Sequence, residues 1–191
     1  MTHPASPPFR VLFPHDLIVR RARELARAVA DAMGSEPPLL VAVIEGARPF
    51  ARLLQQHLPT PLPVHEVRAS SYAGTNSTGA VKILLGADLP VHGRDVLLLE
   101  DIVDTGRTID ALKRHFLAGG ARSVRVASLL SKPSRRVVTV DVEFLGFEIP
   151  DEFVIGFGMD LDGRYRELRD VVVYDPAVER AHAADAAAGA R

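Results

Sequence analysis

Residues 97–108 read Leu-Leu-Leu-Glu-Asp-Ile-Val-Asp-Thr-Gly-Arg-Thr, an apolar run that ends in three carboxylates and a polar turn. The segment from Asp95 to Leu99 predicts a buried strand, and the apolar spacing from Thr108 to Leu117 predicts a helix. Backbone N–H groups and hydroxyls at a helix N-terminus bind anions, while carboxylates bind sugar hydroxyls or a metal ion. We therefore predict that this strand end is the active site.

The simplest alternative is that Asp104 or Thr105 caps the following helix and that the acids are solvated. A cap accounts for one acid, but not for three acids followed by Gly-Arg-Thr. The segment also lacks the Gly-x-x-x-x-Gly-Lys-Ser/Thr pattern of a Walker A loop.

The composition sets limits on the class of protein. With 191 residues, 47% of them hydrophobic, the chain is long enough to bury one sizeable core, and we expect a single domain over residues 1–191, flexible at 1–9 and 181–191. The net charge of −1 gives no reason to expect nucleic acid or a membrane surface as a partner. The absence of cysteine excludes disulfides and thiolate catalysis, and it fits a reducing, cytoplasmic location.

Strands and helices alternate through the middle of the chain. Predicted helices cover residues 16–33, 49–58 and 108–117, and predicted strands cover 39–44, 64–69, 95–99, 123–130, 137–147 and 153–157. Residues 70–80 are small and polar and predict a surface lid, with 81–85 pairing back as its other arm. The Ala-rich tail at 181–191 is either a frayed helix or disordered. This order predicts an α/β fold with a central, mainly parallel sheet flanked by helices.

Residues 100–108 closely resemble the phosphoribosyl-diphosphate-binding motif of type I phosphoribosyltransferases. The resemblance implies that fold, with a small hood built from terminal segments. It implies that Glu100 and Asp101 engage the ribose hydroxyls. It also implies that the residues wrapping the 5′-phosphate are Asp104, Thr105, Gly106, Arg107 and Thr108.

Further motifs, in the family's order across residues 40–175, resemble hypoxanthine and hypoxanthine-guanine phosphoribosyltransferases. They are Arg68 to Tyr72, Ser131 to Arg136, Val142 to Asp160 and Arg164 to Arg166. The resemblance implies that Lys132 donates to the purine 6-oxo group, that Phe153 stacks on the base, and that Val154 contacts the base through its backbone. For pyrophosphate it implies Gly46, Ala47, Ser71, Tyr72 and Arg166, and for Mg²⁺ it implies Glu100, Asp101 and Asp160.

Each of these residues also has an ordinary interpretation. Lys132 could be a solvated lysine in a basic turn, Phe153 could be a core residue, and Arg164 and Arg169 compete with Arg166 as exposed arginines.

The sequence also departs from the family pattern at two positions. Glu45 stands where a lysine or arginine usually precedes the glycine, and its carboxylate would repel pyrophosphate if it faced inward. Family members often hold this peptide in a strained, sometimes cis, geometry, and the sequence leaves that open for Ile44–Glu45. Ser131 stands where an acid often precedes the lysine.

The resemblance implies a purine-salvage transferase that moves ribose 5-phosphate from phosphoribosyl diphosphate to hypoxanthine or guanine, giving IMP or GMP and pyrophosphate. Asp104 is the candidate catalytic residue, which would handle the N7 proton of the purine. The partners would be these small molecules and copies of the chain, as a homodimer or homotetramer. Two alternatives stay open, a xanthine-preferring transferase and a non-catalytic regulator that senses phosphoribosyl diphosphate.

Overall fold

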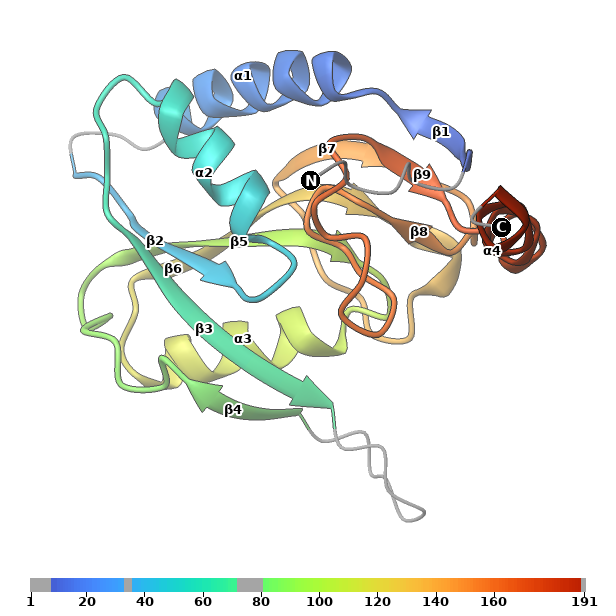
Figure 1. The fold of residues 1–191 in the computed structure, drawn as a ribbon. Helices are drawn as coiled ribbons and strands as arrows, with labels where there is room; N and C mark the ends of the chain where they lie inside the picture. Colours follow the sequence, from blue (N-terminus) through green and yellow to red (C-terminus); the bar gives the residue numbers. More distant parts are fainter. Residues whose placement is uncertain (1–7, 33–35, 72–80, 190–191) are drawn as a thin grey trace.

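The computed structural model describes residues 8–32, 36–71 and 81–189. Among these, six strands form the central sheet in the order β4-β3-β2-β5-β6-β7 (Figure 1). The parallel strands are β2 (Leu39–Val43), β3 (Val64–Ser71), β5 (Asp95–Val103), β6 (Ser123–Ser131) and β7 (Phe144–Glu148), while β4 (Val81–Leu85) runs antiparallel to β3. The prediction of a mainly parallel sheet, and of an arm at 81–85 that pairs back, is confirmed.

Helices cover both faces of this sheet. Helices α1 (His15–Ala32) and α2 (Arg48–His57) lie on one face, and α3 (Arg107–Ala118) lies on the other (Figure 1). Because successive side chains of a strand point to opposite faces, Leu97 and Leu99 of β5 pack with α1 and α2, whereas Leu98 packs with α3. The β5 run is therefore apolar throughout because both of its faces are buried.

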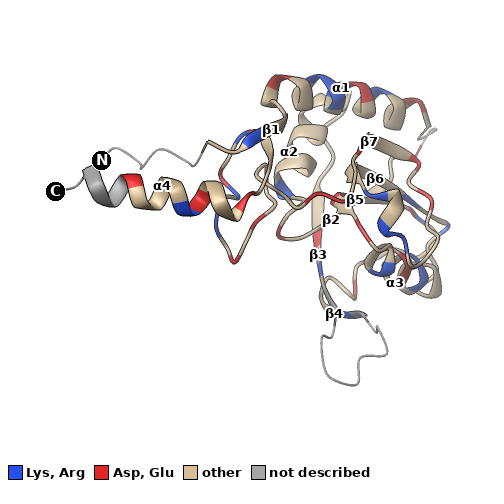
Figure 2. Ribbon diagram, turned by 90° about the vertical axis from the view of Figure 1, so that its right-hand side faces the viewer, with Lys and Arg blue, Asp and Glu red and all other residues tan. Residues whose placement is uncertain are grey.

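A second, smaller sheet forms the hood. Its strands are β1 (Arg10–Phe13), β9 (Val171–Val173) and β8 (Val154–Ile155), antiparallel and in that order. Helix α4 (Pro176–Gly189) follows β9 and extends away from the central sheet (Figures 1 and 2). The hood from terminal segments is thus confirmed, and α4 continues through most of the Ala-rich tail. None of the described helices is long and apolar enough to cross a membrane.

The bounds of several strands differ from the prediction, most of all for the strands predicted at 95–99, 137–147 and 153–157, the last of which forms only at Val154–Ile155. β5 continues to Val103 instead of ending at Leu99, because it lies between β2 and β6 and its pairing with β6 persists from Asp95–Ser123 to Val103–Ser131. Of the strand predicted at 137–147, only β7 forms. The β-branched residues at the start of the predicted strand do not join the sheet. The N–H groups of Val137 and Val138 instead donate to the carbonyl of Thr105, in the turn before α3.

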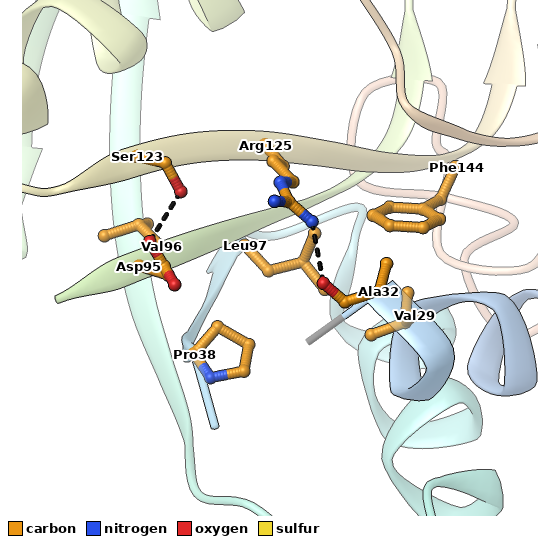
Figure 3. Close-up of a pocket in the computed structure, with 9 residues that line it drawn as sticks. All are labelled: Val29, Ala32, Pro38, Asp95, Val96, Leu97, Ser123, Arg125 and Phe144. Carbon is orange, nitrogen blue, oxygen red and sulfur yellow. Dashed lines mark hydrogen bonds between the residues drawn. The ribbon is translucent and has the colours of Figure 1, made fainter. Parts of the chain in front are cut away.

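At the amino ends of β5 and β6, the polar side chains make hydrogen bonds that hold neighbouring elements together. A small pocket there has its polar side chains already engaged (Figure 3). The Ser123 hydroxyl donates to Asp95 at 2.7 Å, and Arg125 donates to the carbonyl of Ala32, the last residue of α1, at 3.0 Å. Hydrogen bonds from Arg122 and Ser123 lower the pKa of Asp95 to about 2. These bonds join neighbouring strands and helix α1, so this pocket is not the predicted active site.

Candidate active site

The loops at the carboxyl ends of the parallel strands surround an open cavity of about 320 Å³. This is the edge at which open parallel sheets bind their ligands. Eight of the predicted site residues line it, namely Gly46, Asp101, Asp104, Lys132, Phe153, Val154, Asp160 and Arg166, together with Glu45, Ile102 and Met159. The structure therefore brings together side chains that lie up to 120 positions apart in the sequence.

The two adjacent acids of β5 have different surroundings. Asp101 lines the cavity, whereas Glu100 is absent from the described lining residues and is buried. Neighbouring residues of a strand point to opposite faces, which separates the two carboxylates. Oε2 of Glu100 is buried and has no hydrogen-bond partner among the described residues. The pKa of Glu100 is raised well above its usual range, mainly by burial and to a smaller extent by repulsion from the Asp101 carboxylate. Such an uncompensated acid points to a role other than stability.

The surroundings of Asp101 also disfavour its ionised form. Burial raises the pKa of Asp101 to about 6, although its own backbone N–H and that of Ile102, the latter donating at 2.8 Å, favour the ionised form. Among nearby charges, Arg166 lowers the Asp101 pKa and Asp160 raises it. Asp101 is therefore placed to gain a proton or a cation, or to accept from hydroxyl groups of a ligand.

A tight turn lies directly against Asp101. A Cβ atom added at Gly46 would lie 1.8 Å from Oδ2 of Asp101, so only glycine allows this approach. The Ile44–Glu45 peptide is cis, which answers the question that the sequence left open. Ala47 is buried and its N–H donates to the carbonyl of Val43 at 3.3 Å, so of the two residues predicted to contact pyrophosphate in this turn, Gly46 lines the cavity and Ala47 supports it from behind.

Glu45 is not an isolated negative charge beside the cavity. Its carboxylate accepts hydrogen bonds from both Arg48 and Arg68. Arg48 also pairs with Glu66, with Nε at 2.6 Å from Oε1. The sequence signalled a departure at this position, and the two arginines that pair with Glu45 explain how the acid is accommodated.

The turn between β5 and α3 is built on the backbone. Gly106 occupies the N-cap of α3 with φ of +84°, so neither Asp104 nor Thr105 stands at the N-cap position, although the Thr105 hydroxyl accepts a long hydrogen bond, 3.4 Å, from the N–H of Arg107. The guanidinium of Arg136 donates to the carbonyls of Val103 and Asp104 and to the Ser131 hydroxyl. The first N–H groups of a helix have no intrahelical acceptor. Here the N–H of Arg107 donates only the long hydrogen bond to the Thr105 hydroxyl, so the turn can present N–H groups to an anion.

Lys132 and Phe153 form the opposite wall of the cavity. Lys132 is only 7% exposed, and its nearest carboxylate is Asp151, 3.9 Å from Nζ, so it is not a solvated turn lysine. Phe153 is 52% exposed, so it is not a core phenylalanine. Asp104 lies on the same side, where its Oδ1 accepts from Nε of Arg135 at 3.2 Å. The cavity thus offers a buried ammonium donor, an accessible aromatic face and a carboxylate.

Asp160 and Arg166 complete the cavity. Nη2 of Arg166 lies 2.8 Å from Oδ1 of Asp160, and Nη1 donates to the carbonyl of Gly158 at 3.1 Å. The competing arginine, Arg164, instead pairs with Glu179 of α4 at 2.5 Å. A Cβ at Gly158 would lie 2.2 Å from the carbonyl oxygen of Gly46, so this segment packs tightly on the Gly46 turn.

The acids suit a cation that a ligand helps to bind. Among the described residues, no group of three or more His, Cys, Asp or Glu side chains is arranged to hold a metal ion. Mg²⁺ commonly binds one or two carboxylates together with water and substrate phosphates. Asp101 and Asp160 line one cavity, and the charge of Asp160 raises the pKa of Asp101, so the two carboxylates fit such an ion.

Some predicted residues lie elsewhere. Tyr72 is outside the described residues, as is the rest of the predicted lid to residue 80, and Ser71 ends β3. Ile102 and Met159 line the cavity but were not predicted, because nothing distinguishes such apolar side chains from core residues in a sequence. Arg135 and Arg136 were part of the Ser131 to Arg136 motif but were given no role, and their position in the same basic turn as Lys132 was the available signal.

Removing the charge of Asp101 should stabilise the protein. The raised pKa means that ionised Asp101 opposes folding above about pH 6, and this penalty fades as the pH falls toward 3.8, the value of the unfolded chain. We expect Asp101→Asn to raise the free energy of unfolding at pH 7.5 by about 1–2 kcal/mol, with the difference disappearing near pH 4. Urea denaturation in metal-free buffer measures both values.

Asp185→Asn, at an exposed position on α4, is the matched control and should change stability little at either pH. If Asp101→Asn is no more stable than the wild type at pH 7.5, the ionised carboxylate of Asp101 does not destabilise the fold and the prediction is wrong.

Comparisons with known proteins agree with this geometry. A model of the phosphoribosyl transferase domain family matches residues 11–162. The chain is 41% identical over 160 residues to a hypoxanthine-guanine phosphoribosyltransferase of Streptococcus thermophilus, covering 83% of this chain and 89% of that protein. It is 42% identical over 161 residues to the Streptococcus agalactiae enzyme, with the same coverage.

Solved structures give the same result. A hypoxanthine phosphoribosyltransferase from Staphylococcus aureus superposes with a TM-score of 0.83 at 31% identity, over 88% of this chain and 92% of that one. The Trypanosoma cruzi hypoxanthine phosphoribosyltransferase superposes with a TM-score of 0.84 at 32% identity, over 95% and 100% of the two chains. The chain therefore belongs to the type I phosphoribosyltransferase family and, within it, to the hypoxanthine-guanine phosphoribosyltransferases.

Proposed function

We propose that this protein is a purine-salvage enzyme that transfers ribose 5-phosphate from phosphoribosyl diphosphate to hypoxanthine or guanine, yielding IMP or GMP and pyrophosphate. The observation that carries the proposal is one cavity lined by Asp101, Asp104, Lys132 and the exposed Phe153. Few other reactions need an anion site, a sugar site and a flat aromatic platform together.

Each part of the cavity has a role in binding. The turn at residues 104–108 binds the 5′-phosphate through backbone N–H groups and the hydroxyls of Thr105 and Thr108. Asp101 accepts from the ribose hydroxyls, and Glu100, buried behind it, does so only if its carboxylate turns toward the sugar. The purine stacks on Phe153 and makes backbone contacts at Val154.

Lys132 determines which purines bind. An ammonium group has donors and no acceptor, so it favours a 6-oxo group and disfavours the 6-amino group of adenine. Its burial supports this role, because a desolvated ammonium left without an acceptor is costly. The base would therefore supply an acceptor to an ammonium whose nearest carboxylate, that of Asp151, is 3.9 Å away.

The transfer develops positive charge on the ribose. N9 of the purine attacks C1′ while the bond from C1′ to the diphosphate oxygen breaks, and the electron pair leaves with pyrophosphate. The proton on N7 passes to the carboxylate of Asp104. Carboxylates beside the sugar, such as Asp101, favour the oxocarbenium-like transition state electrostatically.

The diphosphate lies at the other end of the cavity. Gly46 and Arg166 contact it, Ala47 supports the turn, and Ser71 and Tyr72 belong to the segment that closes over the reactants and excludes water. Hypoxanthine-guanine phosphoribosyltransferases generally use Mg²⁺. We assign Asp101 and Asp160 as the residues that would hold this ion, joined by Glu100 only if its buried carboxylate turns toward the cavity; the ion would neutralise charge on the departing diphosphate.

We further propose that residues 1–191 act as one phosphoribosyltransferase domain in the cytoplasm, assembled as a homodimer or homotetramer. The cysteine-free composition supports the location. The resemblance to the family supports the assembly.

The reaction is tested with the purified protein, phosphoribosyl diphosphate and Mg²⁺, and hypoxanthine, guanine, xanthine and adenine offered separately. We expect nucleotide formation with hypoxanthine and guanine and at least about tenfold lower kcat/KM with adenine, because Lys132 cannot accept from its amino group. Preference for adenine would contradict the role of Lys132, and preference for xanthine would change the assigned base. Inactivity with all four would favour a regulator that senses phosphoribosyl diphosphate.

The catalytic role of Asp104 predicts a change in turnover. Asp104→Asn keeps the size of the side chain but cannot accept the N7 proton. We expect kcat to fall at least about tenfold, with little change in KM for either substrate. Asp88→Asn, at an exposed position that does not line the cavity, serves as the control. Unchanged turnover of Asp104→Asn would remove this residue from the mechanism.

A further inference from the structure

One carboxylate outside the cavity accepts hydrogen bonds from three side chains. Glu179, in the first turn of α4, accepts at Oε1 from Arg164 and from the Tyr165 hydroxyl, both at 2.5 Å. Its Oε2 accepts from the Tyr174 hydroxyl at 2.6 Å. The Tyr165 and Tyr174 hydroxyls are the main cause that lowers the pKa of Glu179 to about 2, so the carboxylate is ionised throughout the neutral range. None of these four residues lines the cavity.

Tyr174 connects Glu179 to the purine platform. Its backbone N–H donates to the carbonyl of Phe153 at 2.9 Å. Its ring meets the Phe153 ring edge-on, with centroids 5.8 Å apart and an interplanar angle of 74°. Phe153 is half exposed, so its ring contact and backbone hydrogen bond with Tyr174 help to fix where the aromatic platform lies.

Tyr165 connects Glu179 to the diphosphate end. It directly precedes Arg166, which pairs with Asp160. Its φ of +73° is in the left-handed region, which is unfavourable for a bulky residue and persists only when the surroundings hold it. The hydrogen bond to Glu179 and the edge-on contact with the Phe9 ring, 5.6 Å between centroids, provide that restraint.

Phe9 joins the two tyrosines into one unit. Its buried ring also contacts Tyr174, with centroids 5.7 Å apart. Val178 of α4 packs against the same apolar cluster, so the helix has an attachment that does not depend on the Glu179 carboxylate. A variant lacking only that carboxylate should therefore keep α4 attached.

We propose that Glu179 is a positioning residue that couples the C-terminal helix to both ends of the active site. It orients Phe153 through Tyr174 and the segment bearing Arg166 through Tyr165. The inference rests on the proposed function, because it assigns Phe153 to the purine and Arg166 to the diphosphate. It adds that residues beyond the matched domain, at 164–179, tune the affinity for both substrates.

Because Glu179 acts on the purine end through Tyr174 and on the diphosphate end through Tyr165, steady-state kinetics can test the two connections separately. Each substrate is varied at saturating levels of the other. Tyr174→Phe removes one hydroxyl and should raise KM for hypoxanthine about 3–10-fold, with less than about twofold change in KM for phosphoribosyl diphosphate. Tyr165→Phe should give the reverse pattern. Glu179→Ala should raise both KM values, and Glu179→Gln, which keeps one acceptor oxygen, should fall between Glu179→Ala and the wild type.

Glu24→Gln is the matched control, because Glu24 is an exposed acid on α1 that pairs with Arg21. A merely structural role of Glu179 would lower the melting temperature but leave both KM values of the folded enzyme unchanged, and that result would overturn the inference. Equal effects of both tyrosine variants on both substrates would also overturn it. Inactivity of the wild-type protein would refute the proposed function itself, so the two failures are distinguishable. If Glu179→Ala does not fold, Glu179→Gln and the tyrosine variants still decide the question.

Discussion

The site depends on the pairing of β5 with β6 up to the last residue of each strand. Val103 lies opposite Ser131, and the N–H of Lys132 donates to the carbonyl of Val103 at 3.0 Å. This register fixes Asp104 and Lys132 at the ends of neighbouring strands. The proposed proton acceptor and the lysine proposed to bind the purine are therefore both positioned by the paired strands β5 and β6. The other loops are then fitted onto this edge, since Gly46 packs on Asp101 and Gly158 packs on Gly46.

The same edge concentrates charge where folding alone would avoid it. Glu100 and Asp101 continue an apolar strand, and burial raises the pKa of both carboxyl groups. In a protein selected only for stability, such positions would be apolar. Their presence is consistent with the proposed binding of a sugar and a cation, because functional sites commonly reduce stability. The hood contributes differently, because its Phe9, Tyr165 and Tyr174 form a small cluster that supports the binding surfaces from outside.

Much of this arrangement can be predicted from the sequence. Hydrophobic periodicity places the helices near 16–33, 49–58 and 108–117 and the buried strands, because burial on one or two faces leaves a regular pattern. It fails where tertiary contacts override local preference. β5 is extended by its neighbouring strands, and residues 137–143 are drawn across the turn at Thr105 despite their β-branched side chains.

For the site, the resemblance supplied the residues, but exposure decided between their interpretations. Whether Lys132 is buried and Phe153 accessible depends on how distant segments pack, which no local pattern records. The partners of Glu45 and the Glu179 contacts likewise join residues of different elements, and a single sequence carries no signal for such pairs.

A crystal structure of the protein with IMP tests the central claim most directly. The account predicts the 5′-phosphate within hydrogen-bonding distance of the backbone N–H groups at 105–108, and the purine on Phe153 with its 6-oxo oxygen near Nζ of Lys132. N7 should lie beside the carboxylate of Asp104. A nucleotide bound elsewhere, or bound here with its phosphate away from the Gly106 turn, would contradict the account.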